Sequence, residues 1–179
     1  MLPDPLHPAV VHFPIVLMTF LPLAALGALW ALRRGGSPFR AWIVPSVMAG
    51  VLSLSAWAAL QTGEAGEERA EDVVGEQVLS AHEEAAERFL AMSGIVFVIA
   101  AAGLLRGAPG RAARAVATVG TLALLVAGYQ VGHSGGRVAY GTPGAPGVAQ
   151  VGAGGGEGGE GGEGREGGGQ EQGGERDDD

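Results

Sequence analysis

The chain has 179 residues, of which 47% are apolar, yet it carries a net charge of -8 and contains 33 glycines and no cysteine. No single globular core has this composition, and the lack of cysteine excludes disulfides, thiolate metal sites and covalent attachment of a c-type haem. An acidic chain without lysine is also not expected to bind nucleic acid.

Four apolar segments follow one another along the chain, at about 8–32, 39–60, 89–105 and 112–131. Each is close to the ~20 residues that a helix needs to cross the hydrocarbon of a bilayer. The residues before the first segment include an acid and no basic residue, which favours a retained membrane helix over a signal peptide. The sequence therefore predicts an all-α fold, a four-helix transmembrane bundle over residues 1–140, with the lipid bilayer as its partner.

The first segment begins with HPAVVHFPI, which contains His7 and His12. A separation of five residues turns one histidine by about 140° from the other, so the two cannot share a helix face. Pro8 suits the first helical position and leaves His7 at the cap, outside the first turn. We therefore expect His12 to face the interior of the bundle, and His7 either to reach over the top of the bundle or to face water.

Positive charges indicate which way the bundle is oriented. They lie in two short connections: Arg33, Arg34 and Arg40 after the first segment, and Arg106, Arg111 and Arg114 after the third. The positive-inside rule places both connections in the cytoplasm. The two termini and the acid-rich connection 61–88 are then external, as expected for a multi-pass protein of the bacterial inner membrane.

The third and fourth segments carry further signals. The sequence from Ser80 matches an S-x-x-E capping box, which predicts a helix starting there with His82 in its first turn. In the fourth segment, Gly128 and Gly132 have the four-residue spacing that lets another helix or a flat cofactor approach the backbone. His133 follows directly, so these glycines are expected to make room beside it.

The segment after residue 140 differs from the rest of the chain. Residues 141–179 are rich in Gly and Glu and include the run GGGEGGEGGEG. They have too few large apolar side chains to offset the entropy of ordering them. We therefore expect a disordered acidic tail from Gly141 onward.

All four histidines fall at the expected external ends of the helices. Imidazole is a common ligand of haem iron, and a b-type haem with two imidazole ligands needs two facing histidines with little bulk between them. The preferred pair is His12 with His133, whereas His82 and His7 form a second pair or act as replacements. Arg137 is placed to meet a haem propionate.

Other interpretations stay open beside the haem. His12, His82 and His133 are also suitable ligands for divalent Cu or Zn. A third interpretation has no cofactor, with interfacial histidines that bond headgroups, water or backbone in a non-catalytic structural subunit. A hydrolase or transferase is not favoured: Ser134 adjoins His133 in sequence, but catalytic serine, metalloprotease and phosphate-loop motifs are absent.

Several of these motifs together resemble a known family. HPAVVHFPI, the QTG of residues 61–63, His82 and the GHSGGRVAYG of residues 132–141 resemble the bacterial membrane family called domain of unknown function 2231, over residues 6–141. The resemblance carries over His7, His12, Phe13, Pro14, His133, Gly135, Gly136 and Tyr140. Some relatives are joined to cytochrome-like or other redox modules, which implies electron transfer with redox partner proteins; here the Gly/Glu tail stands in their place.

Overall fold

The computed structural model describes the backbone of residues 7–64 and 67–154 and the side chains of residues 9–64 and 70–151. This part of the chain is helical apart from its connections, which include one isolated β-bridge between Thr142 and Ala145. The helices are α1 (His7–Val10), α2 (His12–Arg33), α3 (Pro38–Glu64), α4 (Glu67–Val74), α5 (Glu76–Ala102), α6 (Gly107–Tyr140) and α7 (Val148–Gly154).

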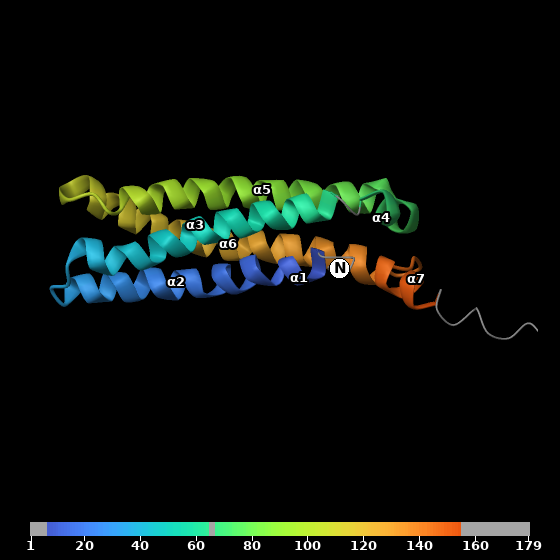
Figure 1. The fold of residues 1–179 in the computed structure, drawn as a ribbon, viewed down its shortest axis with the longest axis horizontal. Helices are drawn as coiled ribbons and strands as arrows, with labels where there is room; N and C mark the ends of the chain where they lie inside the picture. Colours follow the sequence, from blue (N-terminus) through green and yellow to red (C-terminus); the bar gives the residue numbers. More distant parts are fainter. Residues whose placement is uncertain (1–6, 65–66, 155–179) are drawn as a thin grey trace, which may run out of the picture.

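The four long helices lie along one axis (Figure 1), and their contacts close them into a ring. Helix α2 packs against α3 and α6, and α5 packs against the same two helices. Each of the four is long and apolar enough to cross a membrane. These features confirm the predicted all-α fold, a four-helix transmembrane bundle.

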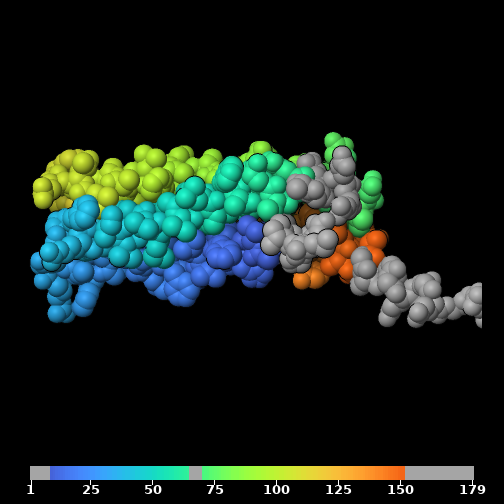
Figure 2. Space-filling view, in the orientation of Figure 1, coloured from blue at the N-terminus to red at the C-terminus, as the bar shows by residue number. Residues whose placement is uncertain are grey.

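Large apolar side chains lie on the outside of this bundle as well as inside it. Leu21, Leu52 and Leu124 fill the interior together with many alanines, whereas Phe20 and Val98 are exposed on the long helices. Figure 2 shows the helices in contact along the length of an elongated molecule. A soluble monomer rarely exposes so much apolar surface, but the same surface is favourable against lipid chains.

The two ends of the bundle differ in the residues that they carry. The connections 34–37 and 103–106 lie together at one end, which we call the arginine end (Figure 1). Helices α1, α4 and α7 lie at the opposite end, which we call the histidine end. The ring of helices therefore separates two sets of polar residues by the full length of the bundle.

Helix α5 begins earlier than the sequence predicts. Gly75, with a positive φ of 79°, precedes its first residue Glu76. Ser80 lies inside the helix, where its hydroxyl donates to the carbonyl of Gln77 (3.3 Å). The predicted capping box at Ser80 is therefore wrong, and His82 lies in the second turn of α5. Gly75 ends α4, because a positive φ of 79° is strained for residues other than glycine.

The order at the carboxyl end also extends beyond the prediction. Helix α6 continues to Tyr140, a turn follows at residues 141–147, and α7 packs against both α6 and α4. Residues 141–154 are thus part of the folded domain, and the predicted boundary at Gly141 is too early. The remainder of the predicted tail, residues 155–179, lies outside the described residues.

This boundary can be tested by truncation. A chain ending at Gly154 is expected to melt at the temperature of the full chain, because the missing segment is mostly Gly and Glu. A chain ending at Tyr140 loses the α7 contacts and should melt lower by about 4–8 °C, the shift that ~1 kcal/mol causes in a small domain. Thermal melting in mild detergent measures both; equal melting of the two truncated chains would contradict the assignment.

A polar contact between three helices closes the arginine end. The indole Nε1–H of Trp42 on α3, a residue only 1% exposed, donates to the carbonyl of Ala100 on α5 (2.9 Å). The guanidinium of Arg114 on α6 donates to the carbonyls of Gly103 (2.7 Å) and Leu105 (3.0 Å). Arg114 is only 5% exposed and satisfies two carbonyls of the connection that follows α5, so it is not a loop charge as the sequence suggests.

Candidate functional site

One layer of contacts at Gly128 shows how α2, α5 and α6 are aligned along the bundle axis. A Cβ atom on Gly128 of α6 would lie 2.1 Å from Sδ of Met18 on α2 and 3.4 Å from a ring carbon of Phe89 on α5. The space at this glycine is therefore occupied by side chains of α2 and α5, which is the first of the two alternatives from sequence, the close approach of another helix. A Cβ on Gly132 would meet nothing within 4 Å.

The layer shows that three histidines lie at one depth. His12, His82 and His133 each stand five to seven residues from it, on the side of the histidine end. At a rise of about 1.5 Å per residue, this places all three roughly 7–11 Å beyond the layer. The inference from sequence that histidines of three helices share one end of the bundle therefore holds for these three.

The preferred pair from sequence does not face the interior. The inward side of α2 carries the buried Pro14 and Leu21, whereas His12 is exposed on another side of the helix. His133 is also exposed, and its ring stacks on Tyr129 of the same helix with centroids 6.0 Å apart and planes at 14°. The expectation that His12 points into the bundle is wrong, because helix packing rotates this position outward.

Helix α1 continues almost directly into α2. Val11 joins α1 to α2 with helical backbone angles (φ -62°, ψ -20°), so the two run as nearly one helix. Position 7 then stands one and two heptads before the buried Pro14 and Leu21, and residues seven apart lie on nearly the same side of a helix. The side chain of His7 is outside the described side chains.

His82 is the histidine that the structure places between helices. It is half-buried, and its Nδ1 lies 3.0 Å from Oγ of Ser134 on α6. Ser134 donates its single hydroxyl proton to the carbonyl of Val131 (3.0 Å). With that proton so placed, its oxygen accepts a hydrogen bond from Nδ1–H of His82. This assignment of the tautomer leaves the ring's lone pair on Nε2.

A glycine makes this contact between α5 and α6 close. A Cβ on Gly135 would lie 3.0 Å from Cε1 of His82, so a larger residue would press on the imidazole. The sequence did not indicate that Ser134 or Gly135 contacts His82, because His82 and Ser134 are 52 residues apart. The only signal was the small-residue run HSGG, which lets a neighbouring helix approach but does not say which one.

A metal ion needs several side-chain ligands that converge on it. The side chains that the structure describes include no group of three His, Asp or Glu that could hold a metal ion. The predicted metal site of His12, His82 and His133 thus has no counterpart among them. Imidazoles at one depth but on different faces do not converge on one ion.

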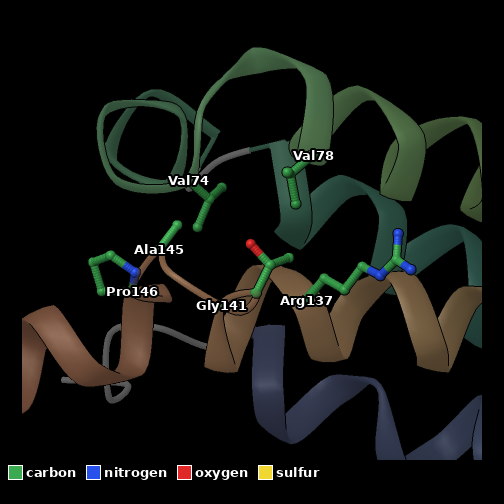
Figure 3. Close-up of a pocket in the computed structure, with 7 residues that line it drawn as sticks. Val74, Val78, Arg137, Gly141, Ala145 and Pro146 are labelled. Carbon is green, nitrogen blue, oxygen red and sulfur yellow. The ribbon is translucent and has the colours of Figure 1, made fainter.

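A small hollow lies near Arg137 (Figure 3). Its volume is about 10 Å³, which is room for about one water molecule, and it is lined by Val74, Val78, Arg137, Gly141, Thr142, Ala145 and Pro146. The guanidinium of the exposed Arg137 extends along α6 away from Gly141 and Pro146 (Figure 3). The hollow is too small for a haem, but Arg137 projects its charge at the histidine end.

Comparison with known families gives one positive result. A family model described as "Predicted membrane protein (DUF2231)" matches residues 3–143. No curated protein and no solved structure matches the chain. The matched range includes the four long helices and every histidine of the chain.

Proposed function

Since the chain belongs to the DUF2231 family of membrane proteins and carries histidines of three helices at one end, we propose that it binds b-type haem there and transfers electrons. His82 is the axial ligand in this proposal. The observation that supports it most directly is the hydrogen bond between His82 Nδ1 and Ser134 Oγ (3.0 Å).

This hydrogen bond gives His82 the chemistry of an iron ligand. Histidines that bind metals usually donate their second ring N–H to an oxygen atom, which fixes the tautomer and the ring plane and raises the basicity of the other nitrogen. Ser134 is that oxygen here, and it is itself held by the carbonyl of Val131. In the proposed site, Nε2 of His82 would be the nitrogen that holds the iron.

The number of protein ligands favours haem over a bare metal ion. A porphyrin supplies four nitrogen ligands, so haem iron needs only one or two imidazoles from the protein. Zinc sites take three or four protein ligands, and the described side chains offer no group of three. Copper or zinc therefore becomes an alternative result of the experiment below and not a second proposal.

The second axial position has three candidates. His7 is favoured because its backbone position lies in register with the inward side of α2. His12 and His133 lie at the right depth but are exposed, and His133 is stacked on Tyr129. Arg137, also exposed at this end, is the candidate partner for a haem propionate through charge-assisted hydrogen bonds.

The proposal also includes the protein's location. The arginines at one end and the acids at the other favour a bacterial inner membrane with the histidine end and both termini outside. A haem there supplies reversible one-electron chemistry, while the chain's residues hold and orient the iron ligand. Its partners would be redox proteins that meet the acid-rich external surface.

The visible spectrum and metal content of the full chain, purified in mild detergent, test this proposal. Cells supplied with haem and metal salts should yield coloured protein whose reduced form shows the sharp bands of a b-type cytochrome. A colourless preparation with stoichiometric Cu or Zn would overturn the haem in favour of a metal. A colourless, metal-free preparation would leave the histidines as interfacial groups and would overturn both.

A further inference from the structure

Five exposed arginines gather at the end of the bundle opposite the histidines. Figure 1 shows the two connections that carry them at one end. In the first set, Arg33 ends α2, Arg34 follows it, and Arg40 lies in the first turn of α3. In the second set, Arg106 precedes α6 and Arg111 lies near its start. The buried contact of Trp42 with Ala100 joins α3 to α5 between the two sets.

No carboxylate of the chain lies near these arginines in sequence. Residues 5–63 and 88–156 contain no Asp or Glu. Within the described part of the chain, an ion pair is formed by Arg88 and Glu84, and it lies on the half of α5 that belongs to the histidine end. The positive charge of the arginine end is therefore not neutralised by acids of the described chain.

Exposed apolar side chains stand directly beside these charges. The guanidinium of Arg34 lies over the ring of Trp30, 4.9 Å from its centroid, and Trp30 is 61% exposed. Phe39 and Leu105 are 57% and 56% exposed and adjoin Arg40 and Arg106 in sequence. Guanidinium groups next to exposed apolar side chains match a molecule that has an anionic head and hydrocarbon chains.

We propose that the arginine end binds anionic phospholipids, with the phosphodiester headgroup on the guanidinium groups and the acyl chains against the exposed apolar residues. Guanidinium groups pair well with phosphate oxygens because their planar N–H donors match the geometry of two acceptors. A soluble anion would not use Trp30, Phe39 or Leu105. The inference is independent of the haem.

Native mass spectrometry of the full chain in mild detergent tests the lipid site. Phosphatidylglycerol should be retained about tenfold or more better than phosphatidylcholine with the same acyl chains, as expected for several basic residues at a membrane surface. Replacing three residues together, Arg33→Gln, Arg34→Gln and Arg40→Gln, should remove this preference. The corresponding triple change to Lys should keep most of it, because it keeps the charge.

The matched control is Arg88→Gln, which removes one arginine from the other half of the bundle and should leave lipid retention unchanged. Millimolar inorganic phosphate should not displace the bound lipid. Equal retention of the two lipids, an unchanged preference in the triple Gln variant, or an equal loss in Arg88→Gln would each overturn the proposal. Complete displacement by phosphate would show a site for a soluble anion and would also overturn it.

Discussion

Under the proposed haem binding, the change His82→Ala is expected to abolish the haem bands of the purified protein, because it removes the imidazole that is held between α5 and α6 by Ser134. His12→Ala and His133→Ala should keep most of the absorbance, since both side chains are exposed on outward sides of their helices. Absorbance per mole of protein, measured for each variant after identical expression with added haem, shows which histidine is required. Loss of the bands in His133→Ala with retention in His82→Ala would restore the pair preferred from sequence.

A matched glycine pair separates loss of the ligand from loss of the fold. Gly135→Val places side-chain atoms against the His82 ring, whereas Gly132→Val adds them where no atom lies within 4 Å. The first variant should shift the reduction potential or lose haem, and the second should behave like the unchanged protein. Similar melting temperatures for the two variants would show that the difference arises at His82.

Arg114→Met is expected to destabilise the bundle by about 2–4 kcal/mol, because loss of charge-assisted hydrogen bonds leaves buried carbonyls without donors. Methionine fills a similar volume but cannot donate to the carbonyls of Gly103 and Leu105, which lie in the connection after α5. The control Arg111→Met removes an exposed arginine from the same helix and should change stability by no more than about 0.5 kcal/mol.

Denaturant titration in detergent, followed by helical circular dichroism, measures this difference. The free energy of unfolding should fall for Arg114→Met and stay close to the original value for Arg111→Met. Equal stabilities of the two variants would show that the carbonyls at the end of α5 find other donors. The same experiment on Trp42→Phe would then report the hydrogen bond of Trp42 to the Ala100 carbonyl, which also accepts from Ser46 (3.0 Å).

The number and approximate positions of the long helices could be predicted from the sequence. Runs of about 20 apolar residues have few alternatives to a membrane helix, since a bilayer leaves no other partner for the backbone groups. The helix ends were less predictable, because polar turns beyond the membrane add residues without changing hydropathy. Helix α6 therefore ends at Tyr140 and not near residue 131.

The candidate site was predictable in depth but not in direction. Position along a helix follows from counting residues, so His12, His82 and His133 could be placed at one end. The rotation of a helix about its axis depends on which side its neighbours cover, and a uniformly apolar segment carries little sign of it. The contact of His82 with Ser134 depends on that rotation in both α5 and α6.

The closure of the arginine end has a consequence for motion. Trp42 and Arg114 link three helices there through backbone carbonyls near the end of α5. Local opening has its lowest free energy where few buried contacts must be broken. We therefore expect the helices to separate more easily at the opposite mouth, where His82 lies, than near the carboxyl end of α5. Amide hydrogens around Gly103 should then exchange with deuterium more slowly than those around Ser134, and the proposed haem would enter through this mouth.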